Sequence, residues 1–229
     1  MKSITSILLS VIVMITNGCN EKSAHVGEAC AIQLPKMHFS RSLNNAAQHA
    51  TVNQDKITIV SEAKKDYFND PEGSTPTNTA PILLSEADNT KPFTLTVKVT
   101  PSFDTTYDAG TVYIFSTNQL WQKFAFERDE RGRTRIVSVR TIDTSDDNNH
   151  DVISQPSVYL KISSDTKKVG LYYSTDNITW NLARLYKNNY PETVWLGISS
   201  QSPIGGGNAS VFEACSLTDK SVNDFRMGI

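Results

Sequence analysis

Short runs of alternating apolar and polar residues recur along the chain from residue 56 to residue 215. Turn-forming residues separate the runs, and the apolar positions do not follow a helical period. Because successive side chains of a strand point to opposite faces, each run predicts a β-strand. The predicted strands span residues 56–60, 93–99, 110–115, 121–127, 135–141, 158–162, 169–174, 180–186, 194–200 and 210–215. Their number and spacing predict an all-β fold, a two-sheet sandwich or jelly roll.

The N-terminus is typical of an exported protein. Residues 1–18 contain Lys2 and an apolar stretch too short to span a bilayer stably, which predicts a signal peptide. The following Thr16-Asn-Gly-Cys19 resembles the lipobox of bacterial lipoproteins, with Thr16 in place of the usual leucine. We therefore expect lipidation at Cys19 and anchoring in the bacterial cell envelope, facing the periplasm or the cell exterior; plain secretory cleavage is the alternative. The expected segments are a signal peptide (1–18), a tether (19–29), one domain (30–217) and a C-terminal tail (218–229).

The chain has three cysteines, an odd number for an exported protein. If Cys19 carries lipid, Cys30 and Cys215 remain, near the two ends of the predicted domain. An oxidising compartment favours a disulfide between them, which in the chain-entropy model would stabilise the fold by about 4–5 kcal/mol. Two independent buried thiols are the alternative.

The charge of the chain does not indicate a nucleic-acid partner. The formal net charge is −2, and the sequence has no block of basic residues. Nucleic acid is therefore not an expected partner.

The run 121–127 carries the clearest candidate site. Alternation places Trp121, Lys123 and Glu127 on one face and two phenylalanines on the other. Extending the argument to neighbouring strands predicts one ligand-binding surface, because aromatic rings cover the apolar side of a sugar while charged and amide groups bind its hydroxyls. The expected residues on this surface are Trp121, Lys123, Glu127, Arg140, Trp195 and Gln201. An internal ion-pair network of Lys123, Glu127 and Arg140 is the alternative.

Several segments together resemble one known family. They are Tyr107-Asp-Ala-Gly110, Trp121-x-Lys123-x-x-x-Glu127, Ser138-Val-Arg-Thr141, Ser145-Asp-Asp-Asn148, Tyr172-Tyr-Ser174, Trp180-x-x-x-Arg184 and Gly197-Ile-Ser-Ser-Gln-Ser-Pro-Ile-Gly205. The sequence resembles the bacterial and fungal unknown-function domains named after the yeast regulator of enolase, in the concanavalin A-like lectin/glucanase superfamily. The resemblance covers about residues 57–212. It implies a jelly roll of two curved antiparallel sheets, whose concave face holds saccharide in related proteins.

Acidic and amide side chains crowd residues 143–151, which we expect to form a loop. Asp146, Asp147 and Asn148 are candidates for binding sugar at the rim of the groove. Asp146, Asp147 and Asp151 are weak candidates for calcium, because hard cations prefer several oxygen ligands. A solvated loop with Asx turns is the alternative, and no cofactor is required by the pattern.

The evidence for catalysis is weaker than that for binding. A glycosidase needs two carboxyl groups beside the scissile bond, and here Glu127 would need Asp146 or Asp147 from another strand. Asp129 and Glu130 look like turn residues instead. The sequence therefore predicts a non-catalytic carbohydrate-binding lipoprotein. The alternatives are a glycoside hydrolase or lyase with Glu127 as acid/base, and a protein-interaction module.

Overall fold

The structure is a computed structural model that describes residues 26–74 and 76–229. The predicted signal peptide, the lipidation site Cys19 and most of the tether lie outside the described residues. Within the described part of the chain, no helix is long and apolar enough to cross a membrane.

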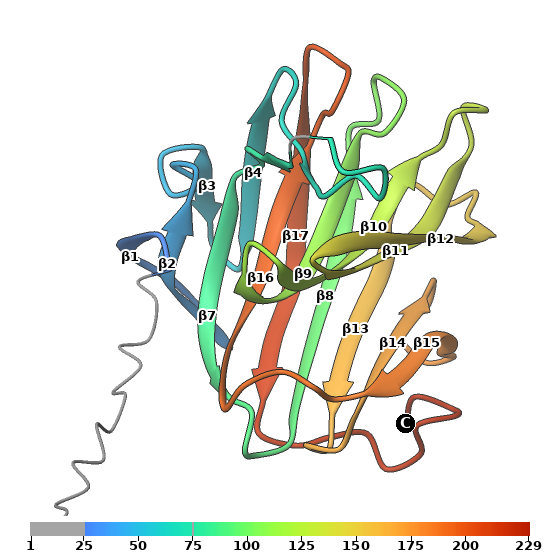
Figure 1. The fold of residues 1–229 in the computed structure, drawn as a ribbon. Helices are drawn as coiled ribbons and strands as arrows, with labels where there is room; N and C mark the ends of the chain where they lie inside the picture. Colours follow the sequence, from blue (N-terminus) through green and yellow to red (C-terminus); the bar gives the residue numbers. More distant parts are fainter. Residues whose placement is uncertain (1–25, 75) are drawn as a thin grey trace, which may run out of the picture.

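Two large antiparallel sheets pack face to face (Figure 1). The first has eight strands in the order β1(Glu28–Leu34), β2(Met37–Leu43), β7(Ile82–Asp88), β16(Thr193–Gln201), β9(Ala109–Thr117), β10(Leu120–Arg128), β11(Thr134–Ile142) and β12(Thr144–Val152). The second has seven strands in the order β15(Asn181–Lys187), β14(Lys168–Ser174), β13(Val158–Ser164), β8(Phe93–Pro101), β17(Gly207–Thr218), β4(Lys56–Glu62) and β3(Ala50–Asn53). A small pair, β5(Tyr67–Phe68) and β6(Thr77–Asn78), lies between β4 and β7 in the chain. The predicted all-β jelly-roll fold is confirmed.

The main core lies between the sheets and follows from the alternation in sequence. In β8, Phe93, Leu95, Val97 and Val99 are buried and point to the same side, while the residues between them are partly exposed. Burying each such side chain contributes roughly 1.5–3 kcal/mol. One apolar face per strand therefore explains why the two sheets pack together.

The segment expected to be an acidic loop is instead strand β12. It pairs with β11 in antiparallel register, from Ile142 opposite Thr144 to Arg135 opposite Val152. The alternation of apolar and polar residues failed to predict this strand because nearly all of its residues are polar. Such a strand is held by its backbone ladder, and its charged side chains suit the edge of a sheet.

The two cysteines of the domain are free thiols in this structure, which corrects the expected disulfide. Cys30 Sγ lies 3.5 Å from the carbonyl oxygen of Phe39, on the neighbouring strand. Cys215 is buried in the core between the sheets. Burial raises the pKa of both thiols, that of Cys215 to about 12, so neither is a thiolate at neutral pH.

The tail after β17 folds back onto the outer face of the seven-stranded sheet, and the C-terminus lies beside β14 and β15 (Figure 1). Val222 and Phe225 form a small apolar cluster with Tyr172 and Trp180. Tyr172 Oη donates a hydrogen bond to the carbonyl oxygen of Phe225 at 2.9 Å. Trp180 therefore packs on the outside of the seven-stranded sheet rather than in the main core.

Candidate functional site

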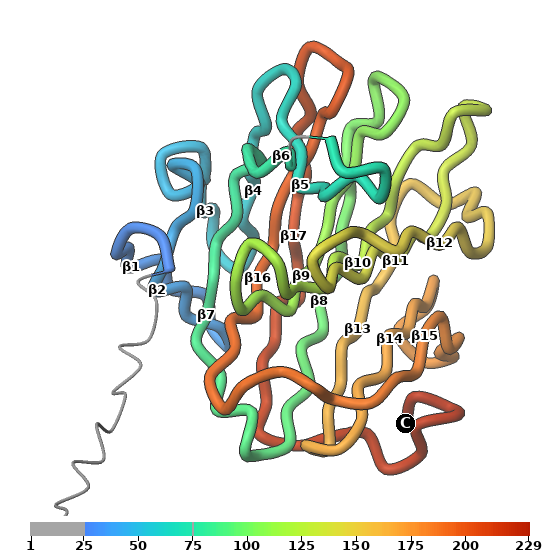
Figure 2. The backbone as a smooth tube through the Cα atoms, viewed as in Figure 1, coloured from blue at the N-terminus to red at the C-terminus, as the bar shows by residue number. Residues whose placement is uncertain are grey.

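The outer face of the eight-stranded sheet carries a second apolar cluster beneath the β5–β6 segment. This segment follows β4 and precedes β7 in the chain, and Figure 2 shows it running across the sheet. The ring of Tyr67 packs edge-on against Tyr113, Phe115 and Trp121, with centroids 5.5–6.3 Å apart. Its hydroxyl donates to Asn118 Oδ1 at 2.7 Å. Tyr67 thus holds the segment over part of this face, and we call residues 66–81 the covering segment.

Beside this cover lies a cavity of about 260 Å³, which we call the Lys123 pocket. The strands β10, β11 and β12 form its floor and one side, and loops from three other parts of the chain form the rest. Its lining consists of Asp66, Phe68, Tyr107, Lys123, Glu127, Val137, Val139, Asp147 and Pro203. The pocket therefore combines three carboxyl groups, one amine, two aromatic rings and an apolar floor.

Lys123 is almost fully buried at the base of the pocket, with a side-chain exposure of 5%. Its Nζ lies 3.2 Å from Asp66 Oδ1, 3.0 Å from the carbonyl oxygen of Tyr67 and 3.1 Å from Gln201 Oε1. An ammonium group has three N–H donors, and here each has an acceptor. Lys123 thereby ties the covering segment to β10 and β16.

Two carboxyl groups in the pocket titrate above their ordinary range. Burial raises the pKa of Glu127 to about 8; the charge of Lys123 opposes this shift, and the charge of Asp147 adds to it. Burial also raises the pKa of Asp147, and Lys123 again opposes the shift. At neutral pH Glu127 therefore holds a proton and can donate a hydrogen bond as well as accept one.

Tyr107 reaches the pocket from a backbone conformation that few side chains adopt, with φ at +67°. The next residue, Asp108, is fully buried and fixes the turn: Ser202 Oγ donates to its Oδ1, and the backbone N–H of Thr105 donates to its Oδ2, both at 2.7 Å. A left-handed backbone at a tyrosine costs of order 1 kcal/mol, and such strain clusters at ligand-binding sites.

Trp121 and Gln201 lie on the predicted face but are fully buried. The ring of Trp121 is covered by Tyr67, so it has no free surface on which a sugar could stack. Gln201 accepts from Lys123, and its Nε2 donates to Tyr113 Oη at 2.6 Å. The ligand-contact roles expected for both residues are therefore corrected: they support Lys123 and the covering segment.

Arg140, Asp146 and Asn148 lie on the opposite side of the sheet from the pocket, which corrects their expected placement. Register pairs Arg140 with Gln122 and Asp146, whereas the pocket residues Lys123 and Asp147 both pair with Val139. The guanidinium of Arg140 lies 4.5 Å from the ring centre of Tyr186 on the other sheet. Alternation places Arg140 and the valines of β11 on opposite faces but does not reveal which face is outward.

Trp195 lies on the outer face but away from the Lys123 pocket. Trp195 and Trp121 both pair with Phe115, which lies on β9 between their strands. Gln201 and Glu127 both pair with Ala109, six residues away from Phe115 on the same strand. Trp195 is partly exposed and packs against the apolar cluster beneath the covering segment. It does not line the same cavity as Glu127.

The three aspartates suggested as metal ligands point in different directions. Asp146 lies 3.3 Å from Arg184, Asp147 lines the Lys123 pocket, and Asp151 accepts a hydrogen bond from Tyr173 Oη. Throughout residues 26–74 and 76–229, no group of three or more histidine, cysteine, aspartate or glutamate side chains is placed to hold a metal ion.

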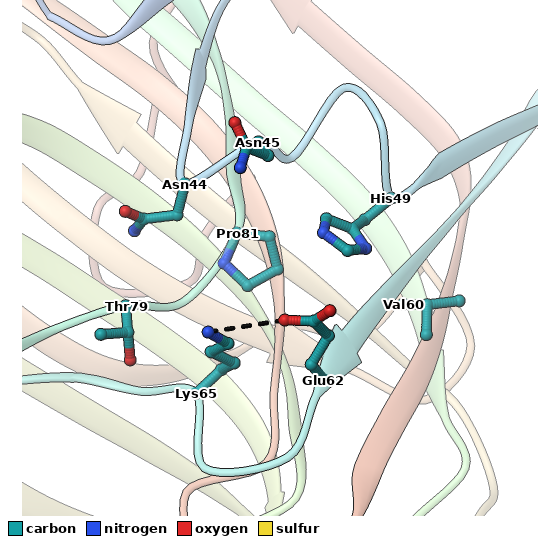
Figure 3. A pocket seen from close by; sticks show the side chains of 8 residues that line it. All are labelled: Asn44, Asn45, His49, Val60, Glu62, Lys65, Thr79 and Pro81. Atoms are coloured by element: carbon teal, nitrogen blue, oxygen red, sulfur yellow. Dashed lines mark ion pairs between the residues drawn. The ribbon is translucent and has the colours of Figure 1, made fainter.

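A second cavity of about 190 Å³, the Lys65 pocket, lies near the loops that join β2 to β3 and β6 to β7. Its lining consists of Asn44, Asn45, His49, Val60, Glu62, Lys65, Thr79 and Pro81 (Figure 3). The ion pair between Lys65 and Glu62 spans 3.5 Å and is well exposed. No residue of this pocket was expected from the sequence to bind a ligand.

Sequence reasoning missed the pocket residues that come from outside strands β10 to β12, namely Asp66, Phe68, Tyr107 and Pro203. Only Tyr107 and Pro203 lay in segments singled out by the family resemblance. Asp66 and Phe68 are distant in sequence from β10 and show no local pattern, so only the fold brings them to the site.

The solved structures most useful for comparison share the fold at low identity. A functionally unknown protein from Saccharomyces cerevisiae has a TM-score of 0.72 and 22% identity, over 79% of this chain and 96% of that one. A mutant GH43 protein from Bacillus licheniformis has a TM-score of 0.63 and 13% identity; the match covers 83% of this chain but only 38% of that one. A legume lectin-like domain from Entamoeba histolytica has a TM-score of 0.50 and 11% identity, over 74% of this chain and 86% of that one.

A search of the curated proteins gives no match. Residues 43–220, most of the two-sheet domain, match the family described as "Protein of unknown function (DUF1349)". The matched segment includes every residue that lines the Lys123 pocket. The chain belongs to the DUF1349 family.

Proposed function

We propose that the protein binds a saccharide in the Lys123 pocket. The lining of the pocket is the observation that carries this proposal. Asp147 accepts hydrogen bonds from sugar hydroxyls, protonated Glu127 donates one, and the rings of Tyr107 and Phe68 cover an apolar sugar face. Lys123 keeps the base of the pocket rigid. The cavity of about 260 Å³ is slightly smaller than the roughly 300–1,000 Å³ of pockets for drug-sized ligands, so it favours a small ligand such as a single sugar residue.

The similar structures support this proposal only at the level of the fold. One is a lectin-like domain, and another is a GH43 protein of which this chain matches 38% of the length. Function resides in sites rather than folds, so the pocket carries the argument. We further propose that Cys19 anchors the protein in the bacterial cell envelope, which would place the pocket among envelope or extracellular glycans.

Affinity electrophoresis tests the proposal. The purified protein is run on native gels cast with a panel of soluble polysaccharides, beside the variants Tyr107→Ala and His49→Ala. We expect at least one glycan to retard the protein, and Tyr107→Ala to weaken that binding about fivefold through loss of the ring contact. His49→Ala, in the Lys65 pocket, serves as the matched control and keeps full retardation. Unchanged mobility across the panel, or equal loss in both variants, would contradict the proposal.

Glycoside hydrolysis is the second candidate, and the state of Glu127 favours it. A carboxyl group with a pKa of about 8 retains a proton that it can donate to a leaving group, and Asp147 lies in the same pocket as a second carboxyl group. Staining the same gels for cleared polymer separates the two functions. A hydrolase clears polymer and loses clearing, but not retardation, in Glu127→Gln; retardation without clearing supports binding alone.

A further inference from the structure

The Lys123 pocket is lined by more acidic than basic groups. Three acidic side chains, Asp66, Glu127 and Asp147, face one basic side chain. That basic group, Lys123, already has three acceptors, one of which is Asp66. Asp66 and Lys123 therefore compensate each other, and the other two carboxyl groups remain.

Glu127 and Asp147 have no ion-pair partner among the described residues. Arg135 lies directly opposite Glu127 on β11, but its guanidinium group is engaged elsewhere. Arg135 Nη1 lies 3.2 Å from Asp129 Oδ2, in a turn where Arg133 binds the same carboxylate at 2.8 Å. Neither carboxyl group therefore has a direct ion-pair partner among the described residues, although the charge of Lys123 acts on both and that of Arg184 acts on Asp147.

Aromatic rings complete the arrangement. Tyr107 and Phe68 line the same cavity, and the negative faces of such rings attract cations. Carboxyl groups combined with aromatic rings recognise ammonium groups, whereas a sugar carboxylate or sulfate would be repelled by Asp147. This combination distinguishes a cationic sugar from both neutral and acidic ones.

We propose that the Lys123 pocket selects a sugar residue that carries a protonated amine, with its ammonium group between the carboxyl groups of Glu127 and Asp147. This inference rests on the proposed saccharide function and names the class of sugar. The amine would supply the direct ion-pair partner that neither carboxyl group has among the described residues.

Binding should release a proton from Glu127. The charges that act on this group are Lys123 on its own strand, Asp147 from β12, Asp66 from the covering segment and Glu130 from the following turn. Lys123 is the only cation among them. A bound ammonium would add a second and lower the pKa of Glu127 from about 8, so a protonated carboxyl group would ionise.

Isothermal titration calorimetry tests this with sugars that differ at one substituent. The probes are glucosamine and galactosamine, their N-acetyl forms, and the parent glucose and galactose. At about pH 6 we expect one amino sugar to bind about tenfold more tightly than its uncharged counterparts. Binding should also release up to about one proton, detected from the difference between two buffers of unlike ionisation enthalpy.

Two variants assign the effect to the named groups. Glu127→Gln should remove the proton release, and Asp147→Asn should reduce the preference for the amine to less than about threefold. Asp147 as a whole is well exposed on β12, although its carboxyl group is partly buried, so its variant tests the idea even if Glu127→Gln folds poorly, which a melting curve reveals. Glu62→Gln, in the Lys65 pocket, is the control and should change neither quantity.

The possible failures are distinguishable. Equal or tighter binding of the neutral sugars would overturn the amine inference and leave the saccharide function standing. If none of the six sugars binds while a polysaccharide retards the protein on gels, the amine inference is likewise overturned. If neither experiment detects binding, both proposals fail.

Discussion

Two adjacent residues, Lys65 and Asp66, belong to two lysine–carboxylate pairs with very different surroundings. Lys65 pairs with Glu62 at 3.5 Å, and the two side chains are 34% and 61% exposed. Asp66 pairs with Lys123 at 3.2 Å, with exposures of 20% and 5%. The distances are similar, but only Lys123 has its remaining donors filled by other buried groups. The pair between Lys123 and Asp66 is therefore the one on which the structure depends. It is identified by its burial and by its complete set of hydrogen bonds, not by the distance between its charged atoms.

The largest effect is expected for Lys123→Met. The substitution leaves Asp66 without its ion-pair partner and Gln201 Oε1 without its donor in a largely buried site, and breaking such a pair typically costs several kcal/mol. We expect the free energy of unfolding in urea to fall by about 3 kcal/mol. A loss below about 1 kcal/mol would place Lys123 with the exposed pairs instead.

The next largest effect is expected for Glu127→Gln, through the pH dependence of the free energy of unfolding. The folded protein holds this proton up to about pH 8, whereas the ordinary pKa of the group is 4.5. Between these values the folded state binds more protons than the unfolded state, so this group makes stability fall as the pH rises. Glu127→Gln should remove that fall and stabilise the protein at pH 8 by on the order of 1–2 kcal/mol, after allowance for partial exposure. Thermal melts between pH 5 and pH 8 would measure this, and parallel curves for the two proteins would contradict the assignment.

The two pockets also differ in backbone strain, for which we expect a smaller effect on stability than for the two substitutions above. In the Lys65 pocket, the positions with positive φ are Asn44 and Asn45, which tolerate that conformation, whereas the Lys123 pocket places Tyr107 there. We expect Tyr107→Asn to raise the free energy of unfolding by about 0.5 kcal/mol while weakening saccharide binding. Opposite signs for stability and affinity would show that strain serves the ligand. A loss of both would mean that the ring chiefly packs.

The smallest effect is expected for Lys65→Met. The pair with Glu62 is well exposed, and such pairs contribute about 0.5 kcal/mol or less. Urea denaturation beside Lys123→Met would measure the contrast directly. A loss above about 2 kcal/mol for Lys65→Met would remove the distinction between the two pairs.

The fold could be predicted from the sequence wherever a strand buries one side. Residues 93–99 alternate cleanly because Leu95 and Val97 enter the core while their neighbours do not. Strand β12 escaped prediction because it is held by backbone pairing at a sheet edge and buries almost no apolar side chain. Alternation reports burial, so it cannot detect a strand without a buried face.

The candidate site could be predicted only in part, for a related reason. Lys123 and Glu127 share a face because they lie four residues apart on one strand, which is local information. Asp66 and Phe68 arrive from a segment more than fifty positions earlier, and nothing near them in sequence indicates their destination. Arg140 was misplaced because the valines of β11, rather than its polar side chains, face outward as the floor of the pocket.

The covering segment, which joins β4 to β7, allows the ligand preference of the pocket to change independently of the stability of the sheet. Its residues Asp66 and Phe68 shape the Lys123 pocket, while the sheet beneath keeps its backbone pairing through β9 and β10. Insertions and substitutions in residues 66–81 can therefore alter which ligand fits without rebuilding the sandwich. One constraint limits this freedom: any replacement segment must still offer acceptors to Lys123 and a ring above Trp121. Diversification within the family should therefore be greatest in this segment, between those two fixed contacts.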